Sequence, residues 1–207
     1  GFRSGEDLVG GYYNTFAGMH SGAGSTSGYE NVGIGYRALF TNTHGRHIVA
    51  IGPQALDVAN PSSATSSYNV AVGAYAGLAV STGQLNTLIG GFAGRSASST
   101  SNNVMVGYST GYYNTTGDSQ TFIGSQAGLG LDANKLTGHN NTLVGYKTGF
   151  LLQGAATANT FIGSLAGDAT TDSSNNTAVG AYALGGDSGD HNTAVGYTAG
   201  TLSTGTR

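Results

Sequence analysis

Pairs of β-branched residues separated by one other residue recur along the chain, and a glycine follows each pair. The copy at Asn192–Gly200 reads Asn-Thr-Ala-Val-Gly-Tyr-Thr-Ala-Gly, and ten near copies precede it. The first residue of each copy, called position 1 below, is Asn14, Asn31, Ile48, Asn69, Asn86, Asn103, Gln120, Asn141, Asn159, Asn176 or Asn192. The commonest spacing is 17 residues, and two spacings are 21. A fixed period of this length is typical of a solenoid built from stacked coils.

The positions within one copy predict a very short strand that ends at a sharp corner. Position 2 is Thr or Val in every copy, and position 4 is Ile or Val in all but the first, where it is Ala17. Position 5 is always glycine, which indicates a positive φ or a close backbone approach. Position 8 is always small, which favours a second short strand after the corner, and glycines three residues before many copies favour a second turn. We therefore predict an all-β parallel β-solenoid, or β-roll, of about eleven 17-residue coils.

Position 3 is apolar or glycine throughout, although it points to the opposite side of the strand from positions 2 and 4. If positions 2 and 4 fill the coil interior, position 3 forms an apolar stripe on the outside. Strands that are apolar on both faces are usually covered on both faces. This pattern predicts a homo-oligomer with its chains packed side by side. The asparagines at position 1 are expected to form a structural ladder at a turn, which Ile48 and Gln120 interrupt.

Composition narrows the possible partners. Only 8% of residues are charged, and 7 Lys and Arg against 10 Asp and Glu give a net charge of -3. This balance argues against nucleic acid and against anionic membranes. The chain has no cysteine and no run of 18 apolar residues, so we expect no disulfide and no membrane insertion in this segment. Its 37 glycines do not indicate disorder, because the apolar residues keep their register.

The repeat pattern covers the chain from end to end. Gly1–Gly5 fits the second half of a copy, and Ser203–Gly205 matches the residues that precede a further copy. We therefore expect one repeat domain, residues 1–207, cut from a longer fibre protein.

The recurring string Asn-(Thr/Val)-x-(Ile/Val)-Gly-x-x-(Ala/Thr)-Gly resembles the repeats of two related kinds of fibre. One is the β-roll head of trimeric autotransporter adhesins. The other is the repeat region of phage tail fibres and similar bacterial fibres with a C-terminal self-cleaving chaperone. The resemblance implies a homotrimer of left-handed parallel β-rolls outside a cell or on a virion. It also implies binding to a cell-surface receptor, either a glycan or a surface protein.

Candidate binding residues lie among the positions that vary. Two tyrosine pairs occur in Gly-Tyr-Tyr-Asn-Thr segments, and exposed tyrosine offers both a flat ring and a hydroxyl to a partner. The segment 44–47 is the one cationic cluster, position 7 has no common chemistry, and the two 21-residue spacings insert loops at residues 57–68, with Pro61, and 129–140. The candidates are Tyr12, Tyr13, Arg37, His44, Arg46, His47, Tyr112, Tyr113 and Lys135.

Other kinds of chemistry find little support in the sequence. His44 and His47 could share a metal, and the segment 185–190 is similar to a calcium-binding glycine-rich repeat, but it occurs once. The aspartates Asp168 and Asp172 likewise stand outside any repeated ligand pattern, so no metal and no cofactor are assigned. No catalytic motif stands out, and position 2 mixes Val with Thr, which argues against ice binding. The sequence favours a non-enzymatic extracellular adhesin or tail-fibre segment; the alternative is a structural shaft that spaces a separate binding tip.

Overall fold

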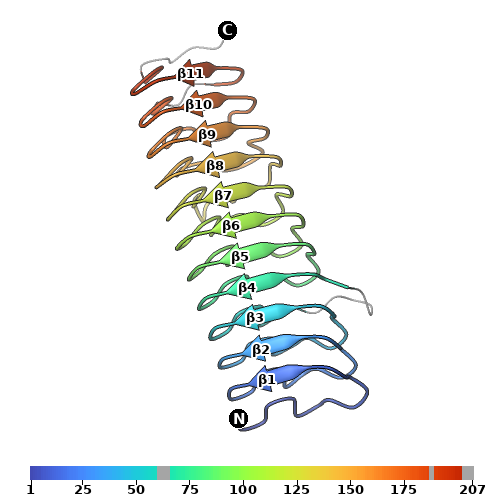
Figure 1. Ribbon diagram of the computed structural model, residues 1–207. Coiled ribbons are helices and arrows are strands. Elements are labelled where there is room, and N and C mark those ends of the chain that lie inside the picture. Colours follow the sequence, from blue (N-terminus) through green and yellow to red (C-terminus); the bar gives the residue numbers. More distant parts are fainter. Residues whose placement is uncertain (60–65, 187–188, 202–207) are drawn as a thin grey trace. The chain divides into compact units, whose positions relative to one another are not determined.

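The computed structural model describes residues 1–59, 66–186 and 189–201 (Figure 1). The chain forms two compact units, Gly1–Asn102 and Asn103–Arg207, each of which is a parallel β-solenoid without helices in its described part. Pro61 and the segment 202–207 lie outside the described residues, as does Asp187. No described segment forms a helix with the length and hydrophobicity needed to span a membrane.

Each coil contributes one three-residue strand at the predicted place, positions 2 to 4 of the copy. The first unit contains β1 (Thr15–Ala17), β2 (Val32–Ile34), β3 (Val49–Ile51), β4 (Val70–Val72) and β5 (Thr87–Ile89). The second contains β6 (Val104–Val106), β7 (Thr121–Ile123), β8 (Thr142–Val144), β9 (Thr160–Ile162), β10 (Thr177–Val179) and β11 (Thr193–Val195). Within each unit every strand pairs in parallel with the strand of the next coil, so equivalent positions of the repeat lie side by side. This confirms the parallel β-solenoid.

The corner after the strand has the conformation that its glycine column predicts. The position 5 glycines have φ between 127° and 142°. A Cβ atom on Gly52 would lie 2.6 Å from the backbone of Gly73 in the next coil, and a Cβ on Gly163 would lie 2.6 Å from Gly180. At corners stacked on a following coil, such as Gly52 and Gly163, the backbone torsion and the close stacking of coils both exclude a side chain; at Gly196 only the torsion does.

The second strand that the sequence favoured at positions 7 and 8 is absent from the described coils, where these residues form turns. Position 7 has a φ of 51° to 61° in every copy, from His20 to Thr198. A left-handed residue reverses the direction of an extended chain, so a strand cannot continue through it. The small residue at position 8 is nevertheless explained, because it is buried against the next coil in most copies. Thr110 and Thr148 there donate hydrogen bonds to corner carbonyl oxygens of the next coil.

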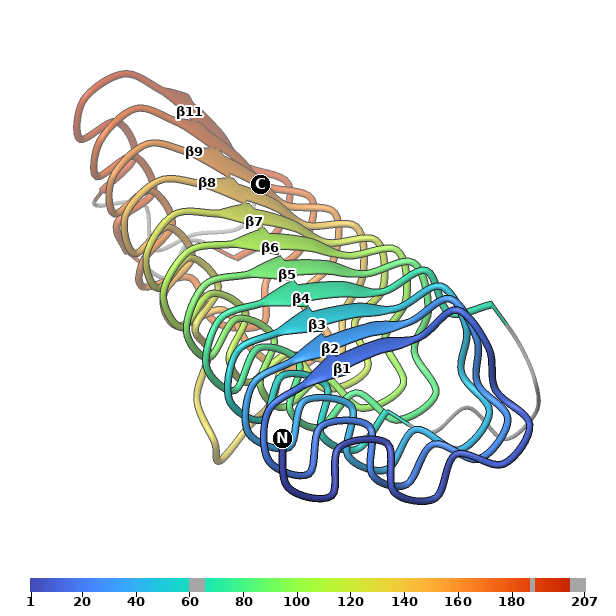
Figure 2. The ribbon, with the colours of Figure 1, turned by 60° about the horizontal axis from the view of Figure 1, so that its bottom comes forward.

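The assignment of the strand faces was wrong. Position 3 lies inside the coil, and positions 2 and 4 lie outside. The fully or almost fully buried position 3 side chains are Ala50, Ala71, Leu88, Met105, Phe122, Leu143, Phe161 and Ala178. Figure 2 looks along the coils, where the strands of each unit form one wall and the turns form the others. The interior is narrow, and position 9 supplies the opposing surface: a Cβ on Gly128 would overlap the Phe122 ring, and one on Gly167 would overlap Phe161.

The asparagines at position 1 form a buried ladder, as expected. Asn159 is typical: its Oδ1 accepts from the amide of Asn176, and its Nδ2 donates to the Ser173 carbonyl and to Asn141 Oδ1. Gln120 does not interrupt the ladder, because its longer side chain donates to Gly138 and accepts from the Asn141 amide. The ladder satisfies buried backbone groups between coils, which is a structural role.

Candidate functional site

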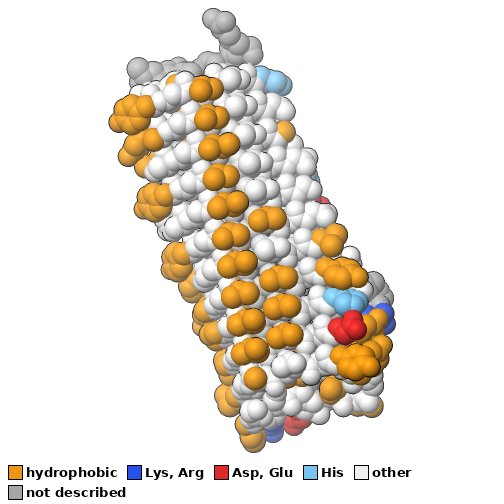
Figure 3. Space-filling model, in the orientation of Figure 1, with side chains coloured by type: hydrophobic (Ala, Val, Ile, Leu, Met, Phe, Trp, Pro, Cys, Tyr) orange, Lys and Arg blue, Asp and Glu red, His pale blue; other side chains and the backbone are white. Residues whose placement is uncertain are grey.

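Aromatic and charged side chains gather on the surface of the first unit just before the strands. They occupy the two positions that precede position 1 in four successive coils. We call the following residues the aromatic column: Tyr12, Tyr13, Tyr29, Glu30, Arg46, His47 and Tyr68. Figure 3 shows hydrophobic, acidic and histidine side chains together at the right-hand edge of this unit.

The rings of the aromatic column contact one another from coil to coil. Tyr12 and Tyr29 stack with their centroids 4.7 Å apart and their planes 5° from parallel. His47 and Tyr68 stack with their ring centroids 4.8 Å apart, and Tyr29 and His47 form a T-shaped contact with a centroid distance of 5.7 Å. Tyr13 packs across Tyr12 at 5.1 Å. Equivalent positions in parallel coils lie one strand spacing apart, so rings at the same position of the repeat are brought into contact.

The charged groups of the aromatic column lie among these rings. His47 Nε2 is 2.6 Å from Glu30 Oε2, and the Arg46 guanidinium lies 4.3 Å from the centre of the Tyr29 ring. Within the described chain Arg46 has no carboxylate in ion-pair distance, and its Nε and His47 Nδ1 are buried without a hydrogen-bond partner. The fold therefore presents a guanidinium whose charge the described residues leave unpaired.

Sequence reasoning found four members of this column, Tyr12, Tyr13, Arg46 and His47, but did not place them together. It missed Tyr29, Glu30 and Tyr68. The signal was present in the spacing, because Tyr13, Glu30, His47 and Tyr68 each directly precede a position 1 residue. Aligning the residues before position 1, as well as those after it, would have revealed the column.

His44 and His47 do not share a site as the sequence allowed. His44 is exposed and its Nδ1 contacts the Thr43 hydroxyl, whereas His47 is part of the aromatic column.

Burial raises the pKa of Asp168, against the opposing effect of backbone hydrogen bonds. Among the residues that the structure describes, no group of three or more His, Asp or Glu side chains could hold a metal ion.

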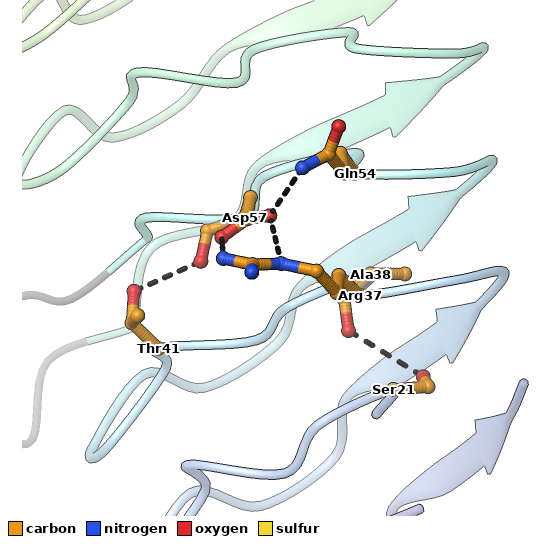
Figure 4. A network of polar contacts seen from close by, with 6 residues as sticks. All are labelled: Ser21, Arg37, Ala38, Thr41, Gln54 and Asp57. Carbon is orange, nitrogen blue, oxygen red and sulfur yellow. Dashed lines mark hydrogen bonds and ion pairs between the residues drawn. The ribbon is translucent and has the colours of Figure 1, made fainter. Parts of the chain in front are cut away.

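Arg37 belongs to a structural network (Figure 4). Its Nε and Nη2 donate to the two carboxylate oxygens of Asp57 at 2.8 and 3.0 Å, and its guanidinium covers the Phe40 ring at 4.1 Å. Gln54 also donates to this carboxylate, and Thr41 donates to the Asp57 carbonyl. The hydrogen bond to Asp57 raises the pKa of Arg37, although burial opposes it. The Arg37 guanidinium therefore links its own coil to the next coil, which contains Asp57.

Replacing Arg37 by methionine is expected to lower the free energy of unfolding by about 3 kcal/mol, because it leaves a buried carboxylate without its charged partner. The Asp57 side chain is only 3% exposed. Lys135→Met is the matched control, since Lys135 and Asp132 are both exposed and lie 3.7 Å apart; its expected loss is below about 1 kcal/mol. Urea unfolding followed by circular dichroism measures both. Equal losses in the two variants would contradict the structural role, and Arg37→Met with Asp57→Leu should recover part of the loss.

The second tyrosine pair is not equivalent to the first. Tyr112 and Tyr113 do not precede a position 1 residue. They precede Asn114, whose side chain caps a turn by hydrogen bonds with Gly117. They are half-buried beside the inserted loop, since the Tyr113 amide donates to Leu129 and its carbonyl accepts from Leu136. Lys135 lies exposed in that loop. The structure thus brings Tyr113 and the loop of Lys135 together in the second unit, whereas the aromatic column belongs to the first unit.

The described surface has two further features, a groove and a row of outward side chains. A groove of about 640 Å³ in the first unit is lined by Arg3, Glu6, Asp7, His20 and Phe40, among others. On the strand face, positions 2 and 4 point outward and form rows of Val, Thr and Ile. Figure 3 shows the Val and Ile side chains of this face in orange, while Thr is white. Ile34, Ile89, Ile123 and Ile162 in these rows are 38% to 41% exposed.

The coil geometry and these surfaces define an all-β solenoid repeat protein. No protein-family model, no curated protein and no solved structure matches the chain significantly.

Proposed function

We propose that this chain is a non-enzymatic segment of a homotrimeric fibre, displayed outside a cell or on a virion, that recognises a cell-surface receptor. The aromatic column carries the proposal. It gathers four aromatic rings, an imidazole, a guanidinium and a carboxylate on a chain in which only 8% of residues are charged. Exposed Tyr and Arg side chains are the residue types that dominate recognition surfaces. The resemblance of the repeat to adhesin heads and tail fibres supports the same function.

The outward apolar rows support the homotrimer. The sequence argument for association placed position 3 on the outside of the strand, which was wrong. The same argument, that an exposed apolar row favours association, applies to positions 2 and 4. Positions 2 and 4 place Val, Ile and Thr in line on neighbouring parallel strands, and a continuous exposed apolar row is an association site. Packing of three such faces around an axis would remove them from water; the number three follows the resemblance to trimeric fibres.

The oligomer has its own test. Sedimentation or light scattering of the wild-type chain should give three times the chain mass of 20.6 kDa. Ile123→Asp with Ile162→Asp places two charges on the apolar row, which should release folded monomers because burying an unpaired charge is strongly unfavourable. Thr116→Asp, at an exposed turn, is the control and should remain trimeric. A wild-type chain that stays monomeric at micromolar concentration would refute the trimer.

Receptor recognition is tested separately, by binding of the labelled trimer to a panel of cells and to a broad glycan array. Saturable binding that is lost when Tyr13 and Tyr68 are changed to asparagine supports recognition. The alternative function is a structural shaft that spaces a binding tip elsewhere, which the apolar rows would serve without any aromatic column. Absence of binding across cells and arrays would favour the shaft.

A further inference from the structure

We propose that the aromatic column is a binding site for an acidic oligosaccharide, with sugar rings against Tyr13 and Tyr68 and a sugar carboxylate on Arg46. This inference rests on the proposed function and names its ligand class. Three observations carry it: the unfavourable backbone conformation of these residues, the open surface of their rings, and the unpaired guanidinium between them.

The backbone conformation shows that the fold alone does not require these side chains. The position directly before position 1 has a φ between 48° and 61° in every coil. Asparagine tolerates this left-handed conformation better than bulky residues do. Asn102, Asn140 and Asn175 occupy it in three of the other coils, and the remaining ones have Leu85, Ser119, Ala158 and His191. Four successive coils of the first unit instead have Tyr13, Glu30, His47 and Tyr68 there. The left-handed φ is a property of every coil, and what distinguishes these four coils is that aromatic and charged side chains gather in it at one surface, which indicates function.

The rings keep surface available to a ligand. Tyr12 and Tyr29 use ring faces on each other, and Tyr68 uses one face on His47, but Tyr13 is 81% exposed and Tyr68 is 53% exposed. A tyrosine ring offers an apolar face to the C–H groups of a sugar and a hydroxyl to its oxygens. Because the rings follow the coil axis, a short chain of sugars can contact more than one coil. This arrangement suits an extended oligosaccharide better than a compact ligand.

The charges select an acidic sugar. Arg46 is positioned over Tyr29, and no described carboxylate pairs with it. Arginine binds a carboxylate through two parallel hydrogen bonds, and stacking on an aromatic ring holds the guanidinium in place for this contact. The Glu30 carboxylate contacts His47 and does not lie within ion-pair distance of Arg46. The Glu30 side chain, 46% exposed, can also accept a hydrogen bond from a sugar hydroxyl.

Titration calorimetry of the assembled protein tests the site with sialyllactose and hyaluronan oligosaccharides as acidic probes and lactose as the neutral counterpart. We expect binding of at least one acidic probe and at least tenfold weaker binding of lactose. Arg46→Gln should weaken the acidic probe about tenfold or more, because it removes the charge-assisted pair. Tyr68→Asn should also weaken it, with an unchanged fold, since asparagine suits the backbone there. Ala158→Asn, at the equivalent position of the second unit with a φ of 57°, is the matched control and should bind normally.

The outcomes separate this inference from the proposed function. Loss of acidic-sugar binding in Arg46→Gln and Tyr68→Asn, with the oligomer intact, supports the site. Lack of binding to every acidic probe overturns it, as does binding that both variants retain. If the protein binds cells and Tyr68→Asn abolishes that binding while no sugar binds, the ligand is a protein and only the ligand class fails. If the protein binds no cell and no sugar, the proposed function fails as well.

Discussion

Replacing Gly163 by alanine is expected to unfold the second unit or to lower its free energy of unfolding by more than about 4 kcal/mol. The φ of Gly163 is 134°, a conformation that side chains rarely adopt, and an added Cβ would lie 2.6 Å from the carbonyl group of Gly180. That neighbour is backbone in the next coil and cannot rotate away. The two coils must separate to make room, which breaks the pairing of β9 with β10.

Two control variants divide this effect into its causes. Gly10→Ala should be almost neutral, because nothing lies within 4 Å of its Cβ position and its φ is not positive. Gly196→Ala keeps the strained φ of 127°, but its nearest Cβ contact is an ordinary 3.9 Å, so it should lose only about 1 to 3 kcal/mol. Thermal unfolding of the three proteins gives the order. If Gly163→Ala were no worse than Gly196→Ala, close stacking at the corner would not be the reason for glycine there.

The coil could be predicted from the sequence because its parts are local. The strand at positions 2 to 4, the corner at position 5 and the asparagine ladder each follow from residue types that repeat in register. The turn at positions 7 and 8 could not be predicted, because its left-handed residues include His20, Arg37 and Phe92, which have no common preference for that conformation. Stacked hydrogen bonds between coils hold these residues in place, and such support is not visible in single residues.

The direction of the strand faces was missed because positions 2, 3 and 4 are all apolar enough to be buried. Positions 3 and 9, compared with each other, show which face of the strand is buried. Where position 3 is large, as in Phe122 and Phe161, position 9 is glycine; where position 3 is Ala178, position 9 is Leu184. Only two positions that share one interior need such compensation in volume. Comparing positions 3 and 9 within the chain would have placed position 3 inside.

Only part of the candidate site was predicted, again because the signal appears only when positions of the repeat are compared. Tyrosine pairs and the cationic cluster were visible as short strings, but their grouping depends on which coil position each residue occupies. Tyr12 and Tyr13 fall just before position 1 and join Arg46 and His47 in the aromatic column, whereas Tyr113 has another register and contacts an inserted loop. In a solenoid, the position of a residue within the repeat determines its spatial neighbours more than the local sequence around it does.

The compensation between positions 3 and 9 gives a second prediction with a large effect. Phe161 is fully buried, and Phe161→Ala should lower the free energy of unfolding by about 3 to 5 kcal/mol, because it leaves a cavity. Gly167→Leu should also be strongly destabilising, since its Cβ would overlap the Phe161 ring. The double variant should be more stable than either single variant. It recreates the arrangement of the next coil, where Ala178 faces Leu184 at a φ of 49°.

Urea unfolding of the two single variants and the double variant measures the coupling between the two positions. The leucine in the double variant still has to adopt a left-handed conformation, so recovery should stop short of wild-type stability by about 1 to 2 kcal/mol. Phe161→Ala combined with Gly128→Leu is the mismatched control, because Gly128 faces Phe122, and its two losses should add. If the matched pair also lost the sum of its single effects, volume exchange across one coil interior would not explain why position 9 is leucine in some coils and glycine in others.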